Sequence, residues 1–133
     1  EIEEAVQAHT GIAEVAVVGV ADPLKGQIPV AFAVVTDPAT VDSADQVRQM
    51  RKEVLDTVDR ELGAIARPGA VHFVTLLPKT RSGKVLRGTM RKIADGESYR
   101  VPATIDDPAT LEEVTMALEQ LGYARQSPAV IGG

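Results

Sequence analysis

The segment Pro78-Lys-Thr-Arg-Ser-Gly-Lys84 has the residue types and order best suited to chemistry. It lies between an apolar run that predicts a strand and a run with helical periodicity. Gly83 gives the backbone freedom to present its neighbour, and we expect Lys84 at the tip of a mobile loop. The Lys84 ammonium could meet two different oxygen atoms at once. The segment is not a phosphate-cradling nucleotide loop, because Val85 stands where the GxxxxGK[ST] pattern needs Ser or Thr.

Charge is unevenly distributed around this segment. Residues 62–94 hold seven basic residues and no acidic one, whereas the whole chain has 14 basic and 19 acidic residues. The seven are Arg67, Lys79, Arg81, Lys84, Arg87, Arg91 and Lys92. This segregation predicts a local positive field that attracts an anion. In the alternative interpretation the basic residues only complement a helix dipole, as Lys92 would before a helix end at Gly96.

The composition argues against several classes of protein. A net charge of −5 is unlike that of a dedicated nucleic-acid binder. Cysteine is absent, which excludes disulfides, thiolate metal sites and cysteine nucleophiles. No apolar run approaches the ~18 residues that span a bilayer, and no signal segment is present. We therefore expect a soluble protein of the cytoplasm, or of the mitochondrial matrix in a eukaryote, with neither a nucleic acid nor a membrane as partner.

The elements around the loop predict a mixed fold. Hydrophobic periodicity predicts helices at 1–9, 43–62, 86–94 and 107–121 and strands at 12–20, 29–35 and 70–77. Ser43 and Gln46 predict a capping box, Gly11 a helix end, and 21–27 a long turn. The prediction is an α+β fold, with a small sheet of about three strands flanked by helices and a disordered tail at 127–133. Because the chain opens inside a helix without methionine, we expect it to be part of a longer protein.

The loop, extended to Leu77 and followed by Leu86-Arg87, resembles the C-terminal signature of AMP-forming acyl-CoA synthetases. Further matches occur in the same order upstream: Glu1-Ile-Glu3, His9 with Ile12, Val15–Val20, Lys25-Gly-Gln27 and Leu62–Pro68. The resemblance covers roughly residues 1–121. Within the family the chain looks most like propionyl-CoA synthetases, and acetyl-CoA synthetases are the near competitor.

The resemblance implies a two-domain ligase in which residues 1–126 form the smaller, mobile lid domain. The large domain would bind ATP, Mg²⁺ and a small carboxylic acid, and the lid would bring Lys84 to the carboxylate and the α-phosphate during adenylation. The lid would then rotate, and CoA would attack the acyl-adenylate. The resemblance also implies acylation of Lys84 by a lysine acetyltransferase, reversed by a deacylase. Without the large domain, we expect the chain to have no ligase activity.

Other site residues follow from the same resemblance. Arg81 and Gly83 would support the loop and a phosphate. Arg60 would contact a CoA phosphate, although the strict register places Asp59 there and an ordinary solvated arginine is the alternative. Gly19 would let the pantetheine arm of CoA approach, or it only accommodates neighbouring backbone.

A cation site is a further implication of the resemblance, and it would involve Gln7, His9 and Ile12. Gln7 and Ile12 could bind only through oxygen atoms, so the site would be a weak one for a hard cation. In the alternative interpretation, His9 is a helix cap or a packing residue.

Two other functions remain open. The chain could be a stand-alone module that binds an anion or a partner through the basic residues of 79–92. It could also be the end of a peptide-synthetase adenylation domain, which would require a carrier-protein domain downstream. The tail gives no sign of such a domain.

Overall fold

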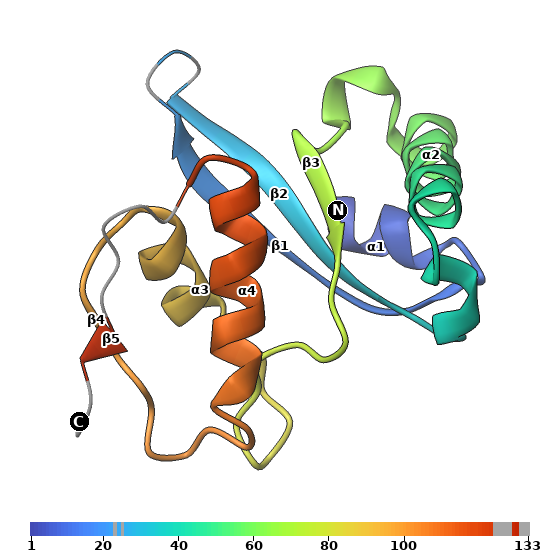
Figure 1. The fold of residues 1–133 in the computed structure, drawn as a ribbon. Coiled ribbons are helices and arrows are strands. Elements are labelled where there is room, and N and C mark those ends of the chain that lie inside the picture. Colours follow the sequence, from blue (N-terminus) through green and yellow to red (C-terminus); the bar gives the residue numbers. More distant parts are fainter. Residues whose placement is uncertain (23, 25, 124–128, 131–133) are drawn as a thin grey trace. The chain divides into compact units, whose positions relative to one another are not determined.

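The computed structural model describes residues 1–22, 24, 26–123 and 129–130. It divides into two compact units, which are described separately: a first unit of Glu1–Val17 and Pro29–Thr75, and a second unit of Val18–Ile28 and Leu76–Gly133. The elements in chain order are α1 (Ile2–Gln7), β1 (Ile12–Asp22), β2 (Gly26–Val35), the 3-10 helix η1 (Pro38–Val41), α2 (Ala44–Leu62), the 3-10 helix η2 (Ala64–Ala66), β3 (Ala70–Phe73), α3 (Arg87–Ala94), β4 (Tyr99–Arg100), α4 (Ala109–Gln120) and β5 (Ala129–Val130) (Figure 1).

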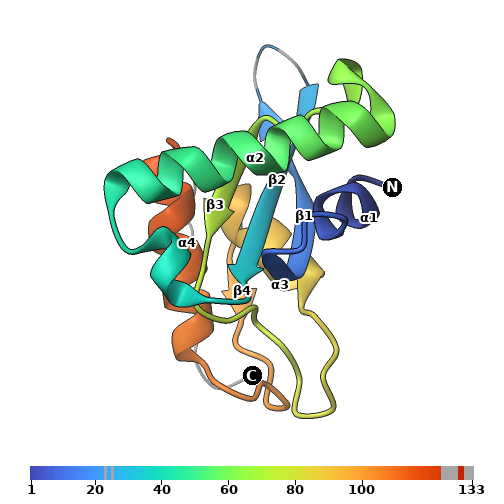
Figure 2. The same ribbon diagram turned by 90° about the vertical axis from the view of Figure 1, so that its right-hand side faces the viewer.

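The main sheet has three strands in the order β1-β2-β3. β2 and β3 are parallel, in a register that runs from Val30 opposite Ala70 to Ala33 opposite Phe73. A parallel pair needs a crossover connection, and α2 supplies it. Figure 2 shows α2 lying across β3 and the adjoining part of β2. The predicted α+β fold with a sheet of three strands is confirmed.

The first unit is held together by the apolar face of α2. Met50, Val54 and Val58 recur every four residues and are buried, so they form one face of the helix. They pack in a cluster with Ala5, Val6, Ile12, Val15, Ala31, Ala33 and Val71. Alanine, valine and isoleucine side chains, with Met50, therefore build this core.

The long helix begins and ends as its sequence predicts. The Ser43 hydroxyl accepts a hydrogen bond from the Gln46 N–H (3.2 Å), and the Gln46 side-chain oxygen accepts one from the Ser43 N–H (3.0 Å). This reciprocal pair is the predicted capping box. Gly63, with φ at +88°, ends the helix.

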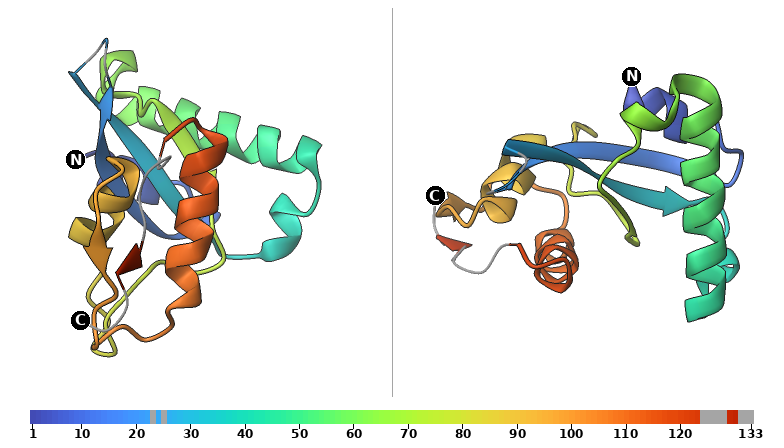
Figure 3. Two further views of the ribbon diagram at one scale, coloured as in Figure 1. Left: turned by 60° about the vertical axis from the view of Figure 1, so that its left-hand side comes forward. Right: turned by 90° about the horizontal axis from the view of Figure 1, so that it is seen from above.

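The second unit packs α3 against α4, which Figure 3 shows from two sides. Its buried side chains include Met90 and Ile93 of α3 and Val114 and Leu118 of α4. α4 begins at Ala109, and the carboxylate of Asp107 accepts the Ala109 N–H (3.0 Å). The N-cap is Pro108, one position later than Asp107, where the predicted helix begins.

Several predicted boundaries were wrong. The first helix ends at Gln7. Gly11 does not have a positive φ, so it does not end the helix in a left-handed conformation. The predicted turn at 21–27 is shorter, because β1 continues to Asp22 and β2 begins at Gly26. The predicted strand at 70–77 ends at Phe73, because beyond Thr75 the chain leaves the first unit for the second.

The C-terminal segment contains a strand pair that periodicity did not predict. β4 and β5 are parallel, with Tyr99 opposite Ala129 and Arg100 opposite Val130. Two residues cannot display a period, so neither strand has a sequence signal. Residues 127, 128 and 131–133 of the expected tail lie outside the described residues, and the domain boundary at 126 stays a prediction.

Candidate functional site

Residues 78–86, here named the signature hairpin, form a closed turn. The Thr80 N–H donates to the Lys84 carbonyl (2.8 Å), and the Leu86 N–H donates to the Pro78 carbonyl (2.9 Å). The Gly83 N–H donates to the Thr80 carbonyl (2.8 Å), and Gly83 has φ of +95°, a conformation that glycine adopts without strain. Arg81 and Ser82 therefore stand at the tip, and Lys84 lies at the closing base. The prediction that Lys84 occupies the tip was wrong, because the turn at Gly83 returns the chain to Thr80.

A second segment supports the signature hairpin from outside. Thr80 forms an antiparallel bridge with Ile105, whose side chain is buried. The Arg81 N–H donates to the Thr104 carbonyl, and the Asp106 N–H donates to the Lys79 carbonyl, each at 2.9 Å. Hydrogen bonds thus fix residues 79–81 on both sides, to the second half of the hairpin and to residues 104–106, and the loop is more firmly anchored than a mobile loop would be.

The side chain of Lys84 is exposed even though its backbone is fixed. Among the described residues, its ammonium has neither a hydrogen bond nor an ion pair. The Arg81 side chain is exposed as well. This arrangement presents a cation from a defined backbone position, where it can reach an anion on a docking surface.

Thr80 is the residue of this site that sequence reasoning missed. Its Oγ1 accepts the Lys84 N–H (3.1 Å) and lies 3.0 Å from the Ser82 hydroxyl. Thr80 stands inside the signature segment, but the role of its hydroxyl has no signal of its own, since it depends on the turn at Gly83. The supporting residues 104–106 had no signal either, because they are distant in sequence.

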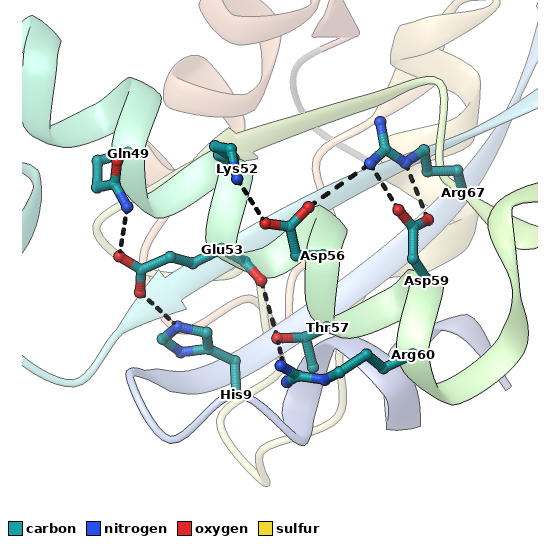
Figure 4. A network of polar contacts seen from close by, with 9 residues as sticks. All are labelled: His9, Gln49, Lys52, Glu53, Asp56, Thr57, Asp59, Arg60 and Arg67. Carbon is teal, nitrogen blue, oxygen red and sulfur yellow. Dashed lines mark hydrogen bonds and ion pairs between the residues drawn. The ribbon is translucent and has the colours of Figure 1, made fainter.

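The seven basic residues of 62–94 divide between the two units. Arg67 belongs to the first unit, where Nε and Nη2 donate to the two carboxylate oxygens of Asp59 (3.0 and 2.7 Å). Nη2 also lies 3.9 Å from Asp56, which in turn accepts from Lys52 at 2.8 Å (Figure 4). The hydrogen bonds from Arg67 lower the pKa of Asp59 below its ordinary value. Arg67 is therefore neutralised, and the other six basic residues belong to the second unit.

Arg60 is exposed in the last turn of α2, where its Nη2 donates to the Thr57 hydroxyl (3.3 Å) (Figure 4). Asp59 stands at the position that the strict register assigns to a phosphate contact. Its carboxylate already accepts a hydrogen bond from Arg67. Of the two neighbours, only Arg60 has a guanidinium to offer an anion. Its role in binding CoA stays a prediction.

The three predicted cation ligands lie close together, and several of their polar groups hydrogen-bond within this region. The Gln7 amide donates to the carbonyls of Ile12 (2.9 Å) and Ala13 (3.0 Å). His9 accepts the Gly11 N–H at Nδ1 (2.9 Å), so Nε2 carries the ring proton and donates to Glu53 (2.9 Å) (Figure 4). Both ring nitrogens of His9 are used, so the ring could not ligate a cation without losing one of these hydrogen bonds. A weak site built from oxygen atoms of Gln7, His9 and Ile12 stays a prediction.

His9 therefore acts as a connection between the end of α1 and α2. Glu53 also accepts a hydrogen bond from Gln49 (3.0 Å). The hydrogen bond from Gln49, followed by that from His9, lowers the pKa of Glu53. Among the described residues, no group of three or more His, Asp or Glu side chains is arranged to hold a metal ion.

Gly19 lies on β1 within the second unit, beneath the side chain of Gln27 on β2. A Cβ at position 19 would stand 2.8 Å from Gln27 Cδ and 2.9 Å from Oε1. The glycine thus accommodates a neighbouring side chain. An approaching pantetheine arm would have to displace Gln27, which is exposed and flexible.

The comparisons with known proteins now define the family. The family of the AMP-binding enzyme C-terminal domain matches residues 1–84, which end at the signature lysine. The chain belongs to this family.

Curated relatives and solved structures agree with this assignment. The chain is 45% identical to the propionate–CoA ligase of Escherichia coli over 120 residues, which is 90% of the chain and 19% of that protein. It is 40% identical over 128 residues to the acetyl-coenzyme A synthetase of Pyrobaculum arsenaticum, covering 96% and 18%. The chain thus spans about a fifth of the length of these relatives.

Among solved structures, an acyl-CoA synthetase from Brucella canis is 36% identical, with a TM-score of 0.59 over 68% of this chain and 16% of that one. An acetoacetyl-CoA synthetase from Streptomyces lividans, at 22% identity, shares the fold, with a TM-score of 0.67 over 90% and 18%. None of the helices in the described part of this family member combines the length and apolar character that crossing a membrane requires.

Proposed function

We propose that this chain is the lid domain of a short-chain acyl-CoA ligase of the propionate- or acetate-activating type, and that Lys84 is its catalytic cation for adenylation. The observation that carries the proposal is an exposed ammonium on an anchored backbone, inside the family's signature segment. The names of the relatives, propionate–CoA ligase and acetyl-coenzyme A synthetase, favour a short carboxylic acid as substrate.

In the first half-reaction, a carboxylate oxygen attacks the α-phosphorus of ATP and the bond to pyrophosphate breaks. ATP and Mg²⁺ would be held by the large domain of the same polypeptide. The attack brings two anionic groups together, and a cation positioned beside both stabilises the transition state more than the ground state. Lys84 can supply that cation because its four-carbon side chain extends from the hairpin without a competing partner among the described residues.

In the second half-reaction, the thiol of CoA attacks the acyl carbonyl and AMP leaves. Lys84 has no role in this step, so the lid can turn away and bring another of its surfaces to the reaction. We assign Arg60 to a CoA phosphate and Gly19 to the approach of the pantetheine arm, with Gln27 displaced. Arg81 and Gly83 support the loop in the first step.

The decisive experiment compares the two half-reactions in the intact ligase. We expect Lys84→Gln to lower acid-dependent pyrophosphate exchange about 10²–10³-fold, as removal of a transition-state donor does. Thioester formation from supplied acyl-adenylate should persist. Lys52→Gln, which removes an exposed lysine of α2, is the matched control and should leave both rates near wild type. Unchanged exchange in Lys84→Gln would refute the catalytic assignment.

Two consequences follow from the same assignment. Acylation of Lys84 by a lysine acetyltransferase would remove the charge and stop adenylation until a deacylase restored it. The 133 residues alone should form no acyl-adenylate, because they would lack the ATP and acid sites. Acyl-adenylate formation by this chain in isolation would contradict the lid assignment.

A further inference from the structure

We infer that Thr80 is a positioning residue for adenylation, acting through the backbone of Lys84. This inference rests on the proposed function, and it concerns a residue that never touches the substrate. Thr80 makes three hydrogen bonds within the signature hairpin that bear on Lys84 or on the turn before it: one from its N–H, one to its carbonyl and one to its hydroxyl. Its bridge to Ile105 connects the same residue to the supporting segment.

The hydrogen bonds determine where the lysine side chain starts. The Thr80 N–H holds the Lys84 carbonyl at 2.8 Å, and the Thr80 Oγ1 holds the Lys84 N–H at 3.1 Å. Both polar groups of the Lys84 main chain are therefore fixed to one residue. Since no side-chain contact orients the ammonium within the described residues, the direction of its Cα–Cβ bond decides where it can go.

The hydroxyl is the informative part of this arrangement. The two backbone bonds of Thr80 would form with any residue at that position, whereas only the hydroxyl accepts the Lys84 N–H. The partly buried hairpin is open to water at its tip, so loss of this bond should cost little folding stability. Catalysis is more sensitive, because small misplacements of a reacting group can lower the rate by orders of magnitude.

The test uses the intact ligase with Thr80→Val, which keeps the shape and removes the hydroxyl. We expect kcat for acid-dependent pyrophosphate exchange to fall about tenfold, the scale of one lost hydrogen bond, with KM for the acid and ATP nearly unchanged. Thr80→Ser should restore most of the rate. Ser82→Ala is the matched control: it removes the other hydroxyl of the turn but leaves the bond to Lys84, and it should stay near wild type.

Two readouts separate positioning from a merely structural role. Thioester formation from supplied acyl-adenylate should be unaffected in Thr80→Val, because Lys84 has no role in that step. A misfolded lid would instead impair both half-reactions. In a Lys84→Gln background, Thr80→Val should cause no further loss of exchange, since the residue acts only through the lysine.

Three results would overturn the inference: an exchange rate for Thr80→Val within about twofold of wild type, an equal loss in both half-reactions, or independent losses in the double variant. If the catalytic assignment of Lys84 itself were wrong, the result would differ: pyrophosphate exchange would be normal in Lys84→Gln. The two failures are thus distinguishable.

Discussion

The α2 surface of the first unit and the signature hairpin of the second unit use the same residue types in opposite ways. At the α2 surface, carboxylates pair with two of the cations: Asp59 and Asp56 hold Arg67, and Asp56 also holds Lys52. In the hairpin, hydrogen bonds fix the backbone, and the side chains of Arg81 and Lys84 extend into solvent.

The difference shows how a small domain can separate stability from chemistry. Exposed ion pairs contribute little to folding, so the α2 pairs mainly arrange the helix surface. The catalytic role proposed for Lys84 requires a cation that stays unpaired until its substrate arrives, and the absence of acidic residues from 62–94 favours this. Anchoring the backbone then limits the positions that the cation can reach.

The largest expected effects on folding stability come from substitutions in the two cores. A buried methionine in each unit allows the two cores to be compared. Met50 lies in the cluster of the first unit and Met90 is fully buried in the second. Either substitution by alanine should lower the free energy of unfolding by about 2–5 kcal/mol, measured by urea denaturation. We expect the larger loss for Met90. A loss below about 1 kcal/mol at either position would show that its unit is less tightly packed than the burial of the methionine indicates.

Alanine substitutions at Gly11 and Gly19 test how much an added Cβ that crowds its neighbours lowers the stability of each unit. A Cβ at Gly11 would stand 3.0 Å from the His9 ring, which Glu53 holds in place, and 3.3 Å from Met50. Gly11→Ala should therefore cost about 1–3 kcal/mol, as overpacking does, measured by thermal unfolding.

Gly19→Ala is the matched comparison, because the neighbouring Gln27 side chain can move away. It should cost clearly less stability than Gly11→Ala. If Gly19 admits the pantetheine arm, this variant should also raise KM for CoA without changing pyrophosphate exchange. Equal losses of stability at the two glycines would contradict the contrast between a fixed and a movable neighbour.

Two glycines of the second unit test the hairpin conformation itself. Gly83 has φ of +95° with open space around a Cβ, so Gly83→Ala should cost about 1–2 kcal/mol through backbone strain alone. Gly88 lies in α3 with equally open space and no such strain. Gly88→Ala should stabilise by about 0.5–1 kcal/mol. Calorimetric melting of both variants checks the opposite signs, and a stabilising Gly83→Ala would disprove the described turn.

The smallest effect is the acid sensitivity of the α2 network. The pKa of Glu53 is lowered from its ordinary value of 4.5 by hydrogen bonds from Gln49 and His9. A lowered pKa contributes stability above pH 4.5, and this contribution is lost as the pH falls through the folded-state value. Glu53→Gln should therefore flatten the decline of Tm below about pH 4.5. An unchanged profile would show that the His9–Glu53 contact contributes nothing to folding.

The predictable parts of the molecule are those that local sequence encodes. The capping box at Ser43 and Gln46 and the apolar face of α2 depend on residues three or four positions apart, so periodicity finds them. The failures involve distant partners. The contact of His9 with Glu53, 44 residues away, has no local signal, so the sequence could not show it. Arg67 was counted with the basic segment because its pairing with Asp59 depends on how α2 and η2 meet.

The sequence by itself determined which segment carries the proposed chemistry, since the order of residues around Lys84 and the absence of acidic residues from 62–94 are both linear properties. Only the tertiary structure decided which cations stay exposed and how Lys84 is held. Thr80 and residues 104–106 meet across about 25 intervening residues, and hydrogen bonds of that kind form only after the chain has folded. A local pattern can thus specify a reactive group, but long-range contacts set the position from which it acts.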